Sequence, residues 1–169
     1  MMELLLAGIV IFVAISVAVR LFNLQPRENK SYYTKKKTFL SPAERSFYGV
    51  LKQSIPGEIE ITCKVRVADV LTPIKGMSRS QWQSTFNKIS AKHFDYVLCA
   101  TNTLEVLAAI ELDDRSHNTL SRIKRDEFLA NACEDAGLPL IRFPAKRSYT
   151  IEEIRTTIIQ ALESTPEDV

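Results

Sequence analysis

Hydrophobic and polar positions divide the chain into three regions. Residues 1–22 are almost entirely apolar, residues 23–37 are polar and basic, and residues 38–165 mix apolar and polar positions with regular periods. Periods near 3.6 predict helices, and strict alternation predicts strands. The pattern therefore predicts an N-terminal apolar helix, a basic linker and one α/β domain.

The predicted domain opens with a helix followed by a strand. Ser41, Pro42 and Glu44 form a capping-box signature in front of the amphipathic run 41–53. After a turn at Pro56, the stretch 58–70 alternates strictly between apolar and polar residues. Its two predicted faces are Ile59, Ile61, Cys63, Val65 and Val67 on one side and Glu60, Thr62, Lys64 and Arg66 on the other.

The pattern in the rest of the domain predicts a hairpin, a helical crossover and a final helix. Residues 72–92 have an irregular, polar and basic pattern, and two apolar runs follow that are joined by a turn at 101–103. The other predicted elements are a helix over 119–136 ending at Gly137, a strand over 138–143, and a helix from a second capping box at 150–153 to about Glu163. This order predicts a mixed sheet with flanking helices.

The N-terminal run has the composition of a membrane anchor. Leu4–Val19 carries no charge, and the run reaches Phe22 if Arg20 extends to the interface. About 20 such residues cross a bilayer. A cleaved signal peptide is the alternative, but the start carries only Glu3 and no basic residue, and no clear cleavage site follows. We therefore expect one retained transmembrane helix.

Charge predicts how this anchor is oriented. Residues 20–37 contain six Lys and Arg and a single acid, Glu28. Basic residues beside a span stay in the cytoplasm, which predicts a single-pass protein of the inner membrane with its N-terminus outside and its domain in the cytoplasm. The run Lys35–Lys37 also suits anionic lipid, and a nucleic-acid-binding arm is the alternative.

Without residues 1–37 the chain is slightly acidic. It keeps 16 Lys and Arg against 18 Asp and Glu, so no overall basic field indicates a nucleic-acid-binding protein. Any such function must come from a local site. Cys63, Cys99 and Cys133 are widely spaced and lie in apolar segments, so we expect free thiols in a reducing compartment.

Acidic residues gather where two predicted strands meet. Asp95 lies in the strand "HFDYVLCA", and Glu111 lies near the end of "AAIELDD". Carboxylates on adjacent strands can come close together, and hard oxygen ligands suit Mg²⁺ or Mn²⁺. Such a metal can polarise a phosphodiester and activate water. The alternative is that these acids are solvated or paired with arginines.

The segments around these acids resemble a known family. "LSPAERSFYGVL", "CKVRVADVL", "KHFDYVLC", "AAIELDDRSH" and "AGLPLIRF" together resemble the bacterial domain of unknown function 2726 over residues 38–145. The order helix, three strands, helix, strand also resembles the PD-(D/E)XK or restriction-endonuclease-like fold, including short-patch mismatch-repair-like nucleases. That resemblance implies an acid in the first helix (Glu44), an acid on the second strand (Asp95) and an E-x-K motif beginning at Glu111.

The motif departs from this resemblance at its last position, where Asp113 replaces lysine. Lys124 or Lys92 could supply the missing cation. Alternatively, Asp113 ligates the metal and His117 assists proton transfer. A third possibility is a catalytically degenerate nuclease fold that only binds.

Several residues also have plainer interpretations. Glu44 can be a capping residue as well as a site residue, and Arg142 can be a structural partner or a phosphate contact. Asp126 suits an ion pair with Arg122, four positions earlier. Trp82 suits packing more than base stacking.

These patterns predict a membrane-anchored, cytoplasm-facing domain that hydrolyses nucleic-acid phosphodiester bonds with Mg²⁺ or Mn²⁺. The predicted metal ligands are Asp95, Glu111 and Asp113, joined in catalysis by His117 and Lys124, with Glu44 and Arg142 as additional residues. The non-enzymatic alternative is a degenerate nuclease fold that serves as a tethered binding or scaffold module.

Overall fold

The computed structural model describes residues 1–23, 31–113 and 120–164, without the side chains of residues 3–5, 21–23 and 120–125. The chain divides into two compact units, Met1–Lys37 and Thr38–Val169. The first contains one helix, α1 (Met2–Asn23). The elements of the second are α2 (Pro42–Ser54), β1 (Ile59–Arg66), η1 (Val67–Asp69), α3 (Arg79–Ser90), β2 (His93–Ala100), β3 (Val106–Asp113), α4 (Leu120–Asp135), β4 (Leu140–Pro144) and α5 (Ile151–Glu163).

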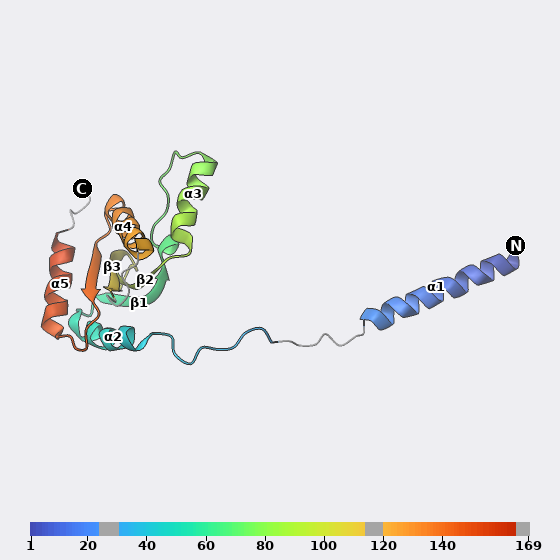
Figure 1. Cartoon of the computed structure of the whole chain (residues 1–169), viewed down its shortest axis with the longest axis horizontal. Coiled ribbons are helices and arrows are strands. Elements are labelled where there is room, and N and C mark those ends of the chain that lie inside the picture. Colours follow the sequence, from blue (N-terminus) through green and yellow to red (C-terminus); the bar gives the residue numbers. More distant parts are fainter. Residues whose placement is uncertain (24–30, 114–119, 165–169) are drawn as a thin grey trace. The chain divides into compact units, whose positions relative to one another are not determined.

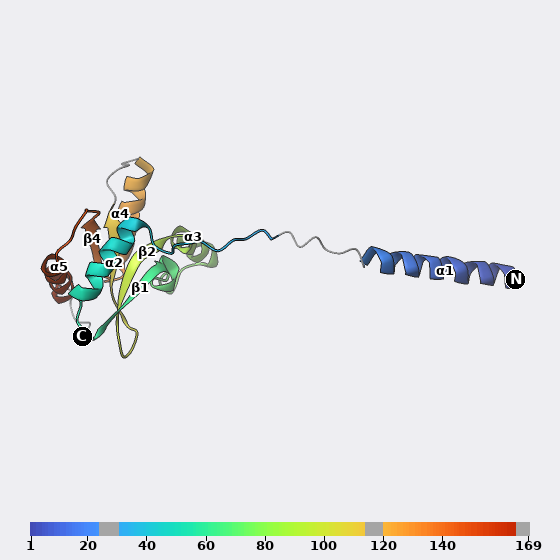
Figure 2. The same ribbon diagram turned by 90° about the horizontal axis from the view of Figure 1, so that it is seen from below.

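The second unit is built on a four-stranded mixed sheet, as the sequence pattern predicts. The strands lie in the order β1-β2-β3-β4. The pairs β1–β2 and β2–β3 are antiparallel, whereas β4 runs parallel to β3 after the crossover through α4. Helices cover both faces of this sheet (Figures 1 and 2).

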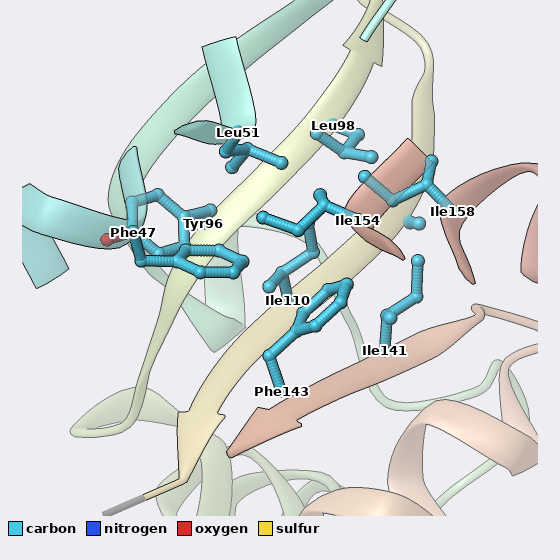
Figure 3. Packing of buried hydrophobic residues seen from close by; sticks show 10 residues of the cluster. Phe47, Leu51, Tyr96, Leu98, Ile110, Ile141, Phe143, Ile154 and Ile158 are labelled. Atoms are coloured by element: carbon cyan, nitrogen blue, oxygen red, sulfur yellow. The ribbon is translucent and has the colours of Figure 1, made fainter. Parts of the chain in front are cut away.

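One face of the sheet packs against α2 and α5 (Figure 3). Phe47 of α2 contacts the rings of Tyr96 and Phe143, with centroid separations of 5.6 and 5.0 Å. Arg155 of α5 joins the two helices by donating to the carbonyl of Ser54 at 3.2 Å. The buried members of this cluster are Phe47, Leu51, Tyr96, Leu98, Ala108, Ile110, Ile141, Phe143, Ile154 and Ile158.

The opposite face packs against α4, η1 and the end of α3. Its buried residues are Val67, Ile89, Phe94, Val97, Cys99, Ala109, Leu129 and Cys133. The α/β/α layering buries apolar area on both faces of the sheet, which is the main source of stability in such a domain. All three cysteines are free thiols, as expected, and Cys99 and Cys133 are buried.

The ends of the helices follow the sequence signals closely but not completely. The capping box of α2 is present, and Gly137 takes a φ of +65° just after α4. Thr150 caps α5 by accepting from the backbone N–H of Glu153. The Glu153 carboxylate instead accepts from Lys146 Nζ at 2.6 Å, so the second predicted capping box forms only by half.

The prediction of irregular structure over residues 72–92 is wrong, because this stretch contains the helix α3. Ser78 and Gln81 form a complete capping box at its N-terminus. Three apolar residues, Trp82, Phe86 and Ile89, follow at intervals of four and three. The apolar signal of this helix is weak, because only these three of its positions are strongly apolar.

The prediction that the apolar residues of β1 share one face is also wrong. Ile61 and Cys63 pack against the α2–α5 cluster, whereas Val65 and Val67 belong to the opposite cluster. Between them Lys64 takes a φ of +56°, in the left-handed region. A single left-handed residue interrupts the alternation of side chains, and the strand changes faces there.

The expected transmembrane helix over residues 4–22 falls within α1. In the part of the chain that the structure describes, no helix combines the length and the apolar character needed to cross a membrane.

Candidate functional site

Three charged side chains from three elements meet at one end of the sheet. Lys64 Nζ of β1 lies 2.7 Å from Glu44 Oε1 of α2 and 2.7 Å from Asp95 Oδ1 of β2. The side chains are only 30%, 18% and 15% exposed, respectively, so water screens them incompletely. We call this group, Glu44, Lys64 and Asp95, the charge triad.

Glu44 serves the helix cap and the charge triad at once. Its Oε2 accepts from the backbone N–H of Ser41 at 2.9 Å, while its Oε1 accepts from Lys64. Its carbonyl oxygen accepts from the Tyr96 hydroxyl at 2.7 Å. The two interpretations that the sequence left open for Glu44 are therefore compatible, because each carboxylate oxygen has its own role.

Asp95 is held by both neighbouring strands. Its Oδ1 accepts from Lys64, and its Oδ2 accepts from the backbone N–H of Leu112 on β3 at 3.0 Å. The flanking register pairs Cys63 with Tyr96 and Val65 with Phe94, on opposite faces of the sheet. Lys64 and Asp95 thus lie where the two strands change faces together.

The charges of the triad stabilise one another. Burial alone would raise the pKa of Glu44, but hydrogen bonds from Lys64 and the Ser41 backbone hold it below its ordinary value. Burial alone would lower the pKa of Lys64, yet Asp95 and Glu44 raise it. Burial, followed by the nearby Asp95 carboxylate, also raises the pKa of Tyr96.

In the strand register, the position of Glu111 on β3 is next to that of Asp95 on β2. Tyr96 pairs with Ile110, so the next step along each strand brings Asp95 and Glu111 to neighbouring positions. Oε1 of Glu111 is shielded from solvent. Burial raises the pKa of the Cys133 thiol of α4 to about 11, and the Glu111 charge adds to the shift.

Asp113 is paired with Arg142, in agreement with the structural interpretation of that arginine. Arg142 Nη1 donates to Asp113 Oδ1 at 3.1 Å, and Nη2 donates to the carbonyl of Asp126 at 3.1 Å. Arg142 therefore ties the end of β3 to α4.

Some of the other predicted residues lie away from the charge triad, and the rest lie outside the described residues. Lys92 donates to the carbonyl of Lys88 and lies over the Phe128 ring, with Nζ 5.0 Å from its centroid. His117 and Asp114 lie outside the described residues, as do the side chains of Lys124 and Arg122.

Lys64 is the residue of the charge triad that sequence reasoning missed. Lys64 stands at a polar position of a stretch that alternates regularly, and an exposed lysine is common at such a position. Its two partners are separated from it by 20 and 31 residues. Its strand position was the available signal, because β1 pairs with β2 and places Lys64 opposite Asp95.

The donor chemistry of this region suits a hard cation in part. Two carboxylates of the charge triad converge on one positive atom, and a third, Glu111, lies at the adjacent strand position. Among the described residues, however, no group of three or more His, Cys, Asp or Glu side chains could hold a metal by itself. Mg²⁺ commonly takes only one or two protein carboxylates and completes its coordination with water and phosphate oxygens.

Comparison with known proteins identifies the family. No curated protein and no solved structure matches the chain. The family model described as protein of unknown function (DUF2726) matches residues 36–162, which span the whole sheet and most of α5. The chain therefore belongs to the DUF2726 family.

Proposed function

We propose that the domain is a nuclease of the restriction-endonuclease-like, PD-(D/E)XK, superfamily that hydrolyses nucleic-acid phosphodiester bonds. The observation that carries the proposal is the convergence of Glu44, Lys64 and Asp95 at one end of the sheet, with Glu111 at the next strand position. The sheet order and the parallel β3–β4 crossover support the same superfamily.

In this proposal the metal is Mg²⁺ or Mn²⁺, held by Asp95 and Glu111. When bound, it would polarise the scissile phosphate and lower the pKa of a coordinated water. Asp113 is not needed as a ligand, because its carboxylate already accepts from Arg142.

Lys64 supplies the cation that the third-strand motif lacks. Its ammonium lies against Asp95, where it can orient a carboxylate or contact a phosphate oxygen. Glu44 holds Lys64 in this position from the helix side. In this proposal Asp95 would contact the metal directly, whereas Glu44 is a positioning residue that acts through Lys64.

A degenerate nuclease fold that acts as a binding or scaffold module is the second candidate. Lys64 pairs with both Asp95 and Glu44 and offsets one of their two negative charges, so the triad is held together without a metal. Such a closed ion-pair group can also serve only to stabilise the fold.

A cleavage assay with the full chain separates the two candidates. We expect cleavage of labelled DNA or RNA that requires Mg²⁺ or Mn²⁺ and falls at least about a hundredfold in Asp95→Asn, a loss typical of a missing catalytic group. The matched control is Asp135→Asn, an exposed acid at the end of α4, which should cleave like the parent. Cleavage equal in both variants, or absent from a folded parent with every substrate form, contradicts the nuclease proposal.

We also propose that the N-terminal unit holds the domain at a membrane, with the domain on the cytoplasmic side. Apolar side chains of α1 are broadly exposed, among them Ile9, Phe12 and Val19 at 55%, 72% and 54%. The basic residues Lys35–Lys37 stand before the domain, where they can contact anionic lipid.

A further inference from the structure

The segment between η1 and β2 differs in charge from the rest of the domain. Residues 70–92, which we call the α3 arm, contain four Lys and Arg and no Asp or Glu. The remainder of residues 38–169 contains 12 Lys and Arg against 18 Asp and Glu. A local cationic segment on an acidic domain favours a polyanionic partner, because each neutralised phosphate releases a counterion. The four cations are Lys75, Arg79, Lys88 and Lys92.

The α3 arm also presents an aromatic surface. The rings of Trp82 and Phe86, one helical turn apart, stack at a centroid distance of 5.0 Å and an interplanar angle of 10°. Phe86 is half-buried, whereas Trp82 is 38% exposed. The inner ring therefore supports the outer one, and Trp82 remains open to stack on a nucleic-acid base.

The remaining exposed positions of α3 favour nucleic acid over a lipid surface. They are polar, including Ser80, Gln81, Gln83, Ser84 and Asn87. A helix that lies in a membrane interface needs a broad apolar face. In α3 the apolar Ile89 is buried in the domain core, which leaves Trp82 and part of Phe86 outside. Amide and hydroxyl groups instead suit phosphate and sugar contacts.

The base of the α3 arm adjoins the charge triad. The chain leaves β1 just after Lys64 and enters β2 just before Asp95, and the backbone N–H of Val67 donates to the carbonyl of Lys92 at 2.8 Å. Figure 1 shows α3 standing apart from α2 and α5, on the side of β1 and β2. A nucleic-acid strand bound along α3 would therefore lead toward the acidic residues of the sheet.

We infer that the α3 arm binds single-stranded nucleic acid, with Trp82 stacking on a base and Lys75, Arg79 and Lys88 contacting phosphates. Single strands are favoured because their bases are free to stack on an exposed ring, whereas duplex bases are already stacked. The inference extends the proposed nuclease function by naming its substrate class. Binding by the α3 arm nevertheless needs neither metal nor cleavage.

Trp82 is the only tryptophan of the chain, so its fluorescence reports on the α3 arm directly. The experiment titrates the full chain, in a non-ionic detergent with EDTA, with a single-stranded oligonucleotide of about 12 nucleotides. We expect saturable quenching and an affinity that falls steeply with salt. Trp82→Leu, followed by oligonucleotide anisotropy, should weaken binding about tenfold, with the circular dichroism spectrum unchanged.

Charge variants test the phosphate contacts. Lys75→Gln/Arg79→Gln should weaken binding at least about tenfold and reduce the salt dependence by about two counterions. The matched control is Lys52→Gln/Arg147→Gln, which removes two exposed cations from outside the α3 arm and should bind like the parent. An equal loss in both double variants would mean that binding follows overall charge, which overturns the inference.

Three further results would overturn the inference. They are absence of quenching, tighter binding of duplex than of single strands, and a Trp82 blue shift with phosphatidylglycerol vesicles but not with the oligonucleotide. Asp135→Asn should bind like the parent, because it changes an exposed acid of α4 and not the arm. A chain that binds but never cleaves therefore contradicts the nuclease proposal alone, and a chain that cleaves without quenching contradicts only the role of the arm.

Discussion

At the scale of single residues, Lys64 holds three elements together. Its ammonium bridges α2 and β2, and its own backbone turns β1 from one face of the sheet to the other. A left-handed conformation at a lysine costs on the order of 1 kcal/mol, so the surrounding contacts must offset it. Such strain is common where a side chain must be placed for function.

Replacing Lys64 with methionine keeps the length of the side chain and removes its charge. We expect a loss of about 2 kcal/mol in unfolding free energy, because two carboxylates would then face each other in an incompletely screened site. Thermal melts of the full chain should show this as a decrease of about 5 °C. Mg²⁺ should restore more stability to Lys64→Met than to the parent, because it can replace the missing cation.

Lys52→Met is the matched control, since Lys52 is exposed on α2 and lies outside the charge triad. It should melt within about 1 °C of the parent. If Lys64→Met melts like this control, the ion pairs contribute nothing to stability. The triad would then have to be explained by function alone.

The pKa shifts predict a specific pH dependence. The pKa of Glu44 is held below its ordinary value of 4.5, so its contribution to stability is complete above that value and is lost as pH falls through the lowered pKa. The pKa of Lys64 is raised, so its contribution is present below 10.5 and is lost only as pH rises through the raised pKa.

In Glu44→Gln the free energy of unfolding should therefore fall less steeply as the pH is lowered. Glutamine still completes a capping box, which separates the charge from the cap. Urea unfolding between about pH 3 and pH 6 should show a weaker pH dependence in Glu44→Gln than in the parent. Glu60→Gln, an exposed strand residue, is the control and should keep the parent's slope. Identical slopes in all three chains would contradict the role of Glu44.

At the scale of elements, α3 and β1 show where sequence patterns mislead. The α2 prediction succeeded because its capping box precedes a clear amphipathic run. The signal of α3 was also complete at Ser78 and Gln81, but the helix exposes most of its surface and so carries few apolar positions. In β1 the alternation of letters was regular, yet Lys64 interrupts the alternation of side chains. Element type follows from local signals, whereas the face of each residue depends on the backbone conformation.

At the scale of the whole molecule, the chain divides into two compact units, Met1–Lys37 and Thr38–Val169. Both buried clusters and the hydrophobic residues packed on them begin at Leu40 and continue toward the C-terminus. Both clusters therefore belong to the second unit. In our proposal the domain carries the chemistry, and the N-terminal unit determines where the protein is located.

A chain lacking residues 1–37 should fold and remain in solution, with a melting temperature within about 2 °C of the full chain. It should also lose the sedimentation with membranes that we expect of the full chain. Replacing Lys35, Lys36 and Lys37 with glutamine in the full chain is the milder control, which should reduce binding to anionic vesicles only. Precipitation of the truncated chain with an exposed core would contradict the independence of the two units.

The sequence by itself determined the order of most elements, the mixed sheet and the candidate acids. Caps, turns and apolar periods are local, so they can be read from neighbouring residues. The tertiary structure decided which charges meet. Lys64 reaches Glu44 and Asp95 because β1 pairs with β2 and α2 packs on the sheet, and Asp113 reaches Arg142 because β4 lies parallel to β3. Such partners are set by strand pairing and layer packing between distant segments, and no local pattern encodes them.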